Sequence, residues 1–195
     1  LPLKAVAVTV PTTSKAVAIT VTNVGGEDPV FTSAGTVNFA ENGAGTVYTA
    51  AAIPEAGKTL TYAISGADAS LFDINATTGA VTFKSSPNYE APADASGNNV
   101  YDLDITASDG TNSATKAVAI SVTNVNEAPV ITSAATASFA ENATGAVYTV
   151  AATDQDAGAT LTYSLTGTDA SRFSINKATG EITFRPPPAV EVPFL

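Results

Sequence analysis

The sequence contains neither cysteine nor histidine, and these two absences exclude large classes of chemistry. Without cysteine the chain forms no disulfide, so its domains must be stabilised by apolar cores or by bound metal. Without histidine and cysteine it cannot build a Ser-His-Asp or Cys-His nucleophile or hold zinc through those ligands. Paired carboxylates can hydrolyse glycosides, but no cleft is predicted between any such pair, and aromatic residues make up only 7%. We therefore expect no enzymatic activity.

Charge is also scarce and is mostly of one sign. Charged residues make up 13% of the chain, and 18 acidic against 8 basic side chains give a net charge of −10. This balance excludes nucleic acid as a partner, because phosphate recognition requires clustered lysine and arginine. No apolar run approaches the roughly 20 residues that span a bilayer, so we expect no membrane span. The start at Leu1, without a charged n-region, predicts a mature or internal segment.

Apolar residues are abundant, at 45%, and they alternate with polar ones. This alternation, with a period of two, predicts two long strands at 100–108 and 114–123. It also runs through 60–64 and 81–83, and Gly, Asn and Asp mark the turns between these segments. A single short helical turn is expected at 67–72. The pattern predicts an all-β fold of seven-stranded Greek-key β-sandwiches.

The chain repeats itself with a period of about 100 residues. FAENGAGTVYTAAA at 39–52 matches FAENATGAVYTVAA at 139–152, and the 27 letters at 57–83 match those at 158–184. We therefore predict tandem sandwiches. Their expected bounds are 25–125 for repeat 1 and 126–195 for repeat 2, with 1–24 as the terminal strands of a preceding repeat or as donor strands for a neighbouring copy.

The two ends of the chain are complementary in sequence. Repeat 2 lacks the last two strands of repeat 1, whereas KAVAITVTNV at 15–24 nearly copies KAVAISVTNV at 116–125. A whole repeat separates the two ends, which makes closure within one chain unfavourable. Two interpretations stay open: the chain is cut from a longer tandem array, or residues 3–22 of one copy complete repeat 2 of the next by β-augmentation and build an open filament.

The few acidic residues gather, with asparagines, at predicted strand ends and joints. Glu41, Glu90 and Glu127 are examples. Calcium takes about six to eight oxygen ligands, which one short loop rarely supplies but several converging loops can. Asn, Asp and Glu at strand ends can equally serve only to satisfy the backbone groups of turns. Both interpretations stay open for any single residue.

Five separated motifs, in this order along the chain, resemble those of the cadherin repeat. They are F-x-E-N at 39–42, Y-E at 89–90, TNVNEAP at 123–129, D-x-D at 154–156, and F-x-I-N-x-x-T-G-x-[IV] at 173–182. The resemblance implies cadherin/immunoglobulin-like sandwiches of the kind found in bacterial-type surface and adhesin proteins. It also implies Ca²⁺ at the joint between the repeats, held by Glu41, Asn88, Glu90, Asn124, Asn126, Glu127, Asp154 and Asp156.

The sequence departs from the family pattern at two of these ligands. Asn124 and Asn88 stand where the family usually has aspartate, and fewer charges predict a weak calcium affinity, on the order of 10⁻⁴–10⁻³ M. A second, weaker metal site is expected before repeat 1, where 53–55 reads Ile-Pro-Glu in place of the Asp-Gln-Asp of repeat 2. Its expected ligands are Asn23, Glu27, Asp28 and Asp109.

Together these features predict a non-catalytic, calcium-stiffened structural or adhesive module of a secreted or cell-surface protein. Its expected partners are other copies of itself or adjacent repeats, head to tail, and cell-surface glycans or proteins. The alternative is a carbohydrate-binding module of a secreted polysaccharide-active protein, because similar cadherin-like modules accompany such enzymes.

Overall fold

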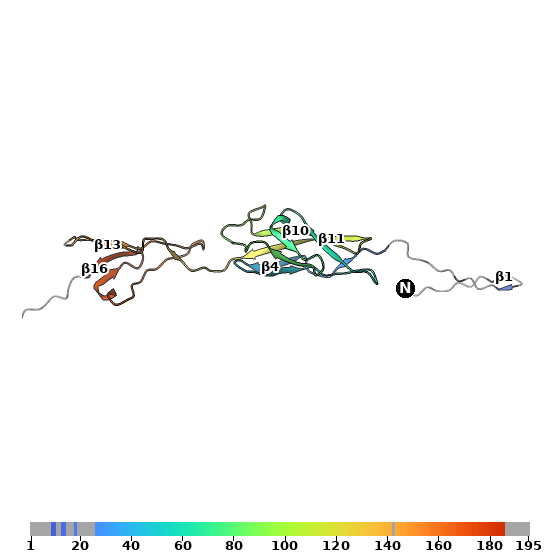
Figure 1. Ribbon diagram of the computed structural model, residues 1–195, viewed down its shortest axis with the longest axis horizontal. Coiled ribbons are helices and arrows are strands. Elements are labelled where there is room, and N and C mark those ends of the chain that lie inside the picture. The colour runs from blue at the N-terminus through green and yellow to red at the C-terminus, as the bar shows by residue number, and fades with distance from the viewer. Residues whose placement is uncertain (1–8, 11–12, 15–17, 19–25, 142, 186–195) are drawn as a thin grey trace, which may run out of the picture. The chain divides into compact units, whose positions relative to one another are not determined.

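The computed structural model describes residues 9–10, 13–14, 18, 26–141 and 143–185, and Figure 1 shows the ribbon. Two compact units account for the tertiary contacts. Unit 1 consists of Leu1–Phe39, Gly43–Ser86 and Asp94–Ser121, and unit 2 of Ala40–Asn42, Pro87–Ala93 and Val122–Leu195. Two short segments that belong to repeat 1 by sequence therefore pack with unit 2.

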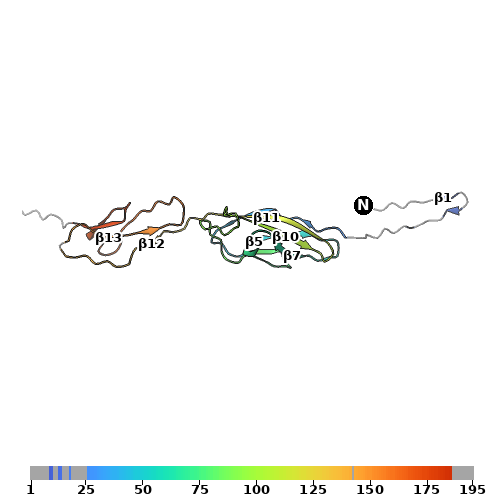
Figure 2. The ribbon, with the colours of Figure 1, turned by 90° about the horizontal axis from the view of Figure 1, so that it is seen from above.

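Repeat 1 is a sandwich of two main sheets with a short edge pair. One sheet has the strand order β4-β11-β10-β7, the other has β5-β9-β8, and β3 pairs with β6. The strands are β3 (Val30–Phe31), β4 (Thr36–Ala40), β5 (Thr46–Thr49), β6 (Ala52–Ile53), β7 (Thr61–Ser65), β8 (Phe72–Ile74), β9 (Ala80–Phe83), β10 (Val100–Ser108) and β11 (Ser113–Thr123). Figure 2 shows β10 and β11 side by side, as their antiparallel register requires. The predicted all-β sandwich is confirmed.

The two long strands supply one half of the core of this sandwich. Seven side chains on their inner face are at most 4% exposed: Tyr101, Leu103, Ile105, Ala107, Val118, Ile120 and Val122. They alternate with outward residues because successive side chains of a strand point to opposite faces. Phe72 of β8 and Val81 of β9 close the core from the opposite sheet. Tyr101 meets Phe72 and Phe83 edge to face, with ring centroids 5.8 and 5.1 Å apart.

Two buried aspartates anchor the long loop between β9 and β10. The carboxylate of Asp68 accepts hydrogen bonds from the backbone N–H groups of Ala95 and Asp102, both at 2.7 Å. Asp94 accepts bonds from the backbone N–H groups of Asn98 and Asn99, both at 3.0 Å. Burial alone would raise the pKa of Asp94, but its hydrogen bonds outweigh burial and lower that pKa. The part of this loop from residue 94 onward is therefore held by hydrogen bonds between these two carboxylates and backbone N–H groups.

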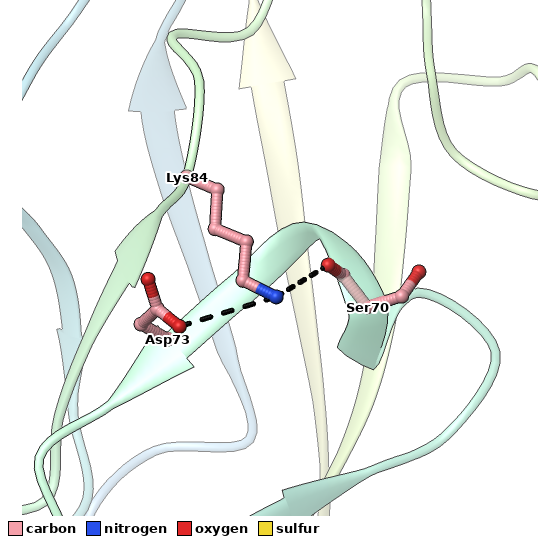
Figure 3. A network of polar contacts seen from close by, with 3 residues as sticks. All are labelled: Ser70, Asp73 and Lys84. Atoms are coloured by element: carbon pink, nitrogen blue, oxygen red, sulfur yellow. Dashed lines mark hydrogen bonds and ion pairs between the residues drawn. The ribbon is translucent and has the colours of Figure 1, made fainter.

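The 3₁₀ helix η1 (Ala69–Leu71) is the helical turn expected at 67–72. Figure 3 shows how Lys84, just after β9, holds it against β8. The Lys84 ammonium donates to the carbonyl of Ser70 at 2.8 Å and lies 3.9 Å from the Asp73 carboxylate. All three groups are exposed, so this network orients the turn but contributes little stability.

Repeat 2 retains only part of this architecture. Its strands are β12 (Val130–Ile131), β13 (Ala146–Thr149), β14 (Ala152–Thr153), β15 (Phe173–Ile175) and β16 (Glu181–Phe184), with the 3₁₀ helix η2 (Ala170–Arg172). The sheet β13-β16-β15 matches β5-β9-β8, and the pair β12-β14 matches β3-β6. The counterparts of β4 and β7, residues 136–140 and 162–166, form no strand. A four-stranded sheet like that of repeat 1 is therefore absent from the described residues of repeat 2.

Most of the N-terminal segment assigned to 1–24 lies outside the described residues. Within it, β1 (Thr9–Val10) pairs antiparallel with β2 (Thr13–Ser14). The predicted division of the chain into 1–24, 25–125 and 126–195 stays a prediction.

We predict that the inner face of β11 dominates the stability of repeat 1. Ile120→Ala should lower the free energy of unfolding by about 2–5 kcal/mol, because it leaves a cavity in a core position that is 0% exposed. Lys84→Ala, which removes only the exposed network, should cost less than about 1 kcal/mol. Urea denaturation followed by circular dichroism measures both. Equal losses for the two variants would contradict this account of the core.

Candidate metal centre

Glu41 is a buried carboxylate that joins three segments of unit 2. It follows β4 directly, and its backbone N–H donates to the carbonyl of Thr123 at the end of β11, at 3.0 Å. Its side chain is 3% exposed and accepts bonds from the backbone N–H groups of Tyr89 and Val125, both at 2.8 Å. The segments 40–42, 87–93 and 122–127 are therefore held around one negative charge.

Two further carboxylates lie beside Glu41, and each has one oxygen without a hydrogen bond. Glu90 Oε1 accepts from the Asn124 amide at 2.7 Å, and Glu127 Oε1 accepts from the Asn42 amide at 2.6 Å. The other oxygen of each, Glu90 Oε2 and Glu127 Oε2, is buried and has no hydrogen-bond partner. Because a buried charged oxygen without a partner is costly, both atoms indicate a ligand.

The three glutamates form one compact group. One carboxylate oxygen each of Glu41, Glu90 and Glu127 lies within 4.8 Å of the others. Burial raises the pKa of Glu127, and the negative charges of Glu41, Asp156 and Glu90 raise it further. A divalent cation at this position would satisfy the two free oxygens and remove the repulsion. The residues present therefore fit a metal ion.

Asp156 supports the group from its edge. It accepts a bond from the backbone N–H of Glu127 at 2.8 Å and another from the Asn124 amide at 3.1 Å. Asp154 accepts from the backbone N–H of Asp156 at 3.0 Å and so stabilises its own turn. Asp156 thus contacts the segment that carries Glu127, whereas Asp154 bonds to the backbone of Asp156.

The two remaining asparagines of the predicted set lie close by but use their amide groups elsewhere. Asn88 donates to the side-chain oxygen of Gln155 at 2.9 Å and accepts from the backbone N–H of Ala91 at 2.9 Å. Asn126 donates to the backbone carbonyl of Glu127 at 2.8 Å. Both keep the loops in place around the glutamates.

The predicted ligand set omitted two contributing residues. Asn42, whose φ is 57°, orients Glu127, and Gln155 pairs with Asn88. Asn42 belongs to the F-x-E-N motif, so its position beside Glu41 was a usable signal. For Gln155, the only signal in the sequence was its position between Asp154 and Asp156.

The described members of the second predicted set, Glu27, Asp28 and Asp109, form no acidic cluster of three, and this site stays a prediction. Asp109 Oδ1 accepts from the backbone N–H groups of Thr111 and Asn112, both at 2.8 Å, and these bonds lower the pKa of Asp109. Glu27 and Asp28 are exposed, and Asn23 lies outside the described residues. Among the residues described, Glu41, Glu90 and Glu127 form the only acidic cluster of three.

The fold is that of a cadherin-like domain, as the sequence motifs predicted. Human protocadherin-24 EC1-2, in crystal form II, is 25% identical with a TM-score of 0.59, over 81% of this chain and 79% of that chain. Drosophila N-cadherin EC1-4 is 23% identical with a TM-score of 0.55, over 82% of this chain and 41% of that chain.

Among curated proteins, Halomucin from Haloquadratum walsbyi is 43% identical over 77 residues. The match covers 37% of this chain and 1% of Halomucin, so it spans a very small part of that protein. No protein-family model matches the chain. In the part of the chain that the structure describes, no helix has the length and apolar character needed to cross a membrane.

We predict that Glu127→Gln stabilises the metal-free site. Folding raises the pKa of Glu127, so the ionised carboxylate opposes folding. The free energy of unfolding of the wild type therefore falls as the pH rises from the ordinary glutamate pKa through the raised pKa of Glu127. Glutamine keeps an oxygen for the Asn42 amide and removes the charge. The stability difference between Glu127→Gln and the wild type should vanish at a pH below the ordinary glutamate pKa. It should reach its full size at a pH above the raised pKa of Glu127.

Hydrogen exchange of the Tyr89 and Val125 amides in chelator, followed by NMR across this pH range, measures the effect. Glu181→Gln, at an exposed glutamate of β16, is the matched control and should leave protection unchanged at every pH. A Glu127→Gln variant that exchanges faster than the wild type at neutral pH would contradict the prediction.

Proposed function

We propose that the chain is a non-catalytic structural or adhesive module of an extracellular protein, and that calcium binds to the Glu41, Glu90 and Glu127 group. The observation that supports this most directly is the pair of buried carboxylate oxygens without partners, Glu90 Oε2 and Glu127 Oε2. They lie in a group where three negative charges meet. The cadherin-like fold supports the structural role.

The donor set favours calcium over other divalent ions. The group offers only carboxylate and amide oxygens, and the sequence has neither histidine nor cysteine, which softer metals prefer. Its candidate ligands come from three separate segments of the chain. The flexible coordination of calcium accepts such a donor set, whereas magnesium requires a near-ideal octahedron. Asn88 and Asn124 in place of aspartates favour an affinity on the order of 10⁻⁴–10⁻³ M, typical of extracellular modules.

Calcium would stiffen unit 2 by joining segments that now depend on a few hydrogen bonds. An ion that binds only the folded arrangement adds a stabilisation that grows with its concentration above the dissociation constant. The segments 40–42, 87–93 and 122–127 would then move as one body. Stiffening therefore depends on a calcium-rich medium.

Isothermal titration with Ca²⁺ tests this proposal. The wild type should bind with millimolar or submillimolar affinity, and Glu90→Gln combined with Glu127→Gln should weaken binding at least tenfold, because both free oxygens lose their charge. The Glu181→Gln control should bind like the wild type. Binding that is unchanged in the double variant would sink the proposal, as would the absence of any heat at millimolar calcium.

Two measurements on the same proteins distinguish a calcium-stiffened structural module from a carbohydrate-binding module, the alternative that the comparisons do not favour. Small-angle scattering should detect calcium-dependent stiffening in the wild type but not in the double variant. Retention on insoluble polysaccharide, independent of calcium, would favour the alternative instead.

We also propose that copies of the chain associate head to tail by β-strand donation. The near-identity of 15–24 to 116–125 supports this association.

A further inference from the structure

The turn between β8 and β9 in repeat 1 is built on Asn75. The backbone N–H of Asn75 donates to the carbonyl of Ala80 at 2.8 Å, and its own carbonyl accepts from the N–H of Gly79 at 2.8 Å. The side-chain oxygen Asn75 Oδ1 accepts from the backbone N–H groups of Thr77 and Thr78, both at 3.0 Å. An asparagine oxygen that bonds the backbone two residues on closes an Asx turn. Three of the four polar groups of Asn75 are therefore used by the hairpin.

The fourth group, the amide nitrogen Asn75 Nδ2, makes no hydrogen bond within the described residues. The hydroxyl of Thr77 makes none there either. Both side chains are exposed, so water satisfies these two groups. Neither the nitrogen of Asn75 nor the hydroxyl of Thr77 therefore holds the turn together.

Repeat 2 contains the same turn without the hydroxyl. Asn176 Oδ1 accepts from the backbone N–H groups of Ala178 and Thr179, at 3.0 and 3.2 Å. The backbone N–H and carbonyl of Asn176 are paired across the hairpin at 2.8 and 2.9 Å, as those of Asn75 are. Ala178 stands at the position of Thr77. Because the turn forms with alanine there, the fold does not require the hydroxyl of Thr77.

Asn75, Ala76 and Thr77 together form the acceptor sequence for N-linked glycosylation. In this sequence asparagine is followed by any residue except proline and then by serine or threonine. It occurs a second time at 142–144, where its asparagine lies outside the described residues. At 75–77 the two groups that the acceptor sequence requires, the amide nitrogen and the hydroxyl, are those that the fold leaves unused. Motif and structure therefore indicate the same role for them.

The turn can carry a glycan without losing its hydrogen bonds. A sugar on Asn75 Nδ2 leaves Oδ1 in place for both of its backbone partners. The turn is also held by neighbouring segments of unit 1. The carbonyl of Ala76 accepts from the backbone N–H of Tyr62 in β7 at 2.8 Å, and the carbonyl of Gly79 accepts from that of Ala50 at 2.9 Å. The attachment atom therefore lies on a well-fixed surface turn.

We propose that Asn75 is a site of N-linked glycosylation, and that the donor is a lipid-linked oligosaccharide. The anomeric carbon of the first sugar forms a bond to Asn75 Nδ2, and the bond between that carbon and the phosphate oxygen of the donor breaks. The electron pair of the broken bond leaves with the phosphate, and the amide nitrogen releases one proton to solvent. No oxidant or reductant takes part. The chain must pass through a secretory pathway, as the extracellular role proposed above implies, but neither calcium nor strand donation is required.

The glycan supplies hydration that the side chains provide only sparsely. Charged residues make up 13% of the chain and apolar residues 45%, so few surface charges oppose non-specific association. An N-linked glycan is bulky and solubilising, and it lies on the surface of the protein that carries it. Attached at Asn75, it places this hydrated mass on the β8–β9 turn of repeat 1.

Peptide mass spectrometry of the full chain, secreted by a eukaryotic host with an N-glycosylation pathway, tests the proposal. Trypsin cuts after Lys58 and Lys84, so the peptide 59–84 contains Asn75 and no other asparagine. This peptide should carry a glycan in the wild type. An amidase that removes N-linked glycans should release it and leave an aspartate in place of the asparagine.

Three variants separate the acceptor sequence from the turn. Thr77→Ala copies the turn of repeat 2 and should lower glycan occupancy at position 75 by about tenfold or more, because the acceptor sequence is lost. Asn75→Asp keeps an oxygen for the Asx turn but removes the acceptor nitrogen, so its peptide should carry no glycan. Ala178→Thr completes the acceptor sequence in the equivalent turn of repeat 2 and should place a glycan on Asn176.

A wild-type peptide 59–84 without a glycan overturns the proposal, most clearly if the same host glycosylates Asn176 in the Ala178→Thr variant. Unchanged occupancy of Asn75 in Thr77→Ala overturns it as well. The Glu90→Gln and Glu127→Gln double variant should be glycosylated like the wild type, because the acceptor sequence does not involve the metal centre. The glycosylation proposal and the calcium proposal can therefore fail independently.

Discussion

The pairing of β10 with β11 is the constraint on which most of the structure depends. The pair buries seven side chains in repeat 1 and lies between the other two strands of its sheet. It also fixes the end of β11, where Thr123 accepts the backbone N–H of Glu41 and starts the segment that holds Glu127. One hairpin thus both closes a core and positions a cluster of charge. The described part of repeat 2 contains no counterpart of this hairpin.

In the glutamate group, hydrogen bonds alone leave part of the carboxylate oxygens without partners. Both carboxylate oxygens of Glu41 accept hydrogen bonds from backbone N–H groups. Glu90 and Glu127 each accept one side-chain amide hydrogen bond, and the second carboxylate oxygen of each is buried without a donor. Further N–H donors would relieve the unpartnered oxygens but leave three negative charges together. A cation, as proposed above, would relieve both problems at once. The raised pKa of Glu127 and the unpartnered oxygens occur at the same place.

The fold was largely predictable from the sequence, because alternation is a local signal. The strands expected at 100–108 and 114–123 are β10 (Val100–Ser108) and β11 (Ser113–Thr123). The same signal is misleading at 162–166, where TYSLT alternates like the TYAIS of β7 but forms no strand. Strand formation there depends on a partner distant in sequence, and alternation cannot reveal whether that partner is present.

The acidic residues near the site and the asparagines Asn88, Asn124 and Asn126 were predictable, and only through the motifs. Spacing could not distinguish Glu90, whose second oxygen has no hydrogen-bond partner, from Asp68, whose two oxygens both accept backbone N–H groups. Both are acidic residues near strand ends. The distinction depends on which N–H groups the folded loops bring within reach, and so do the roles of Asn42 and Gln155. Sequence can therefore propose oxygen donors, but the division between structural and free oxygens appears only in three dimensions.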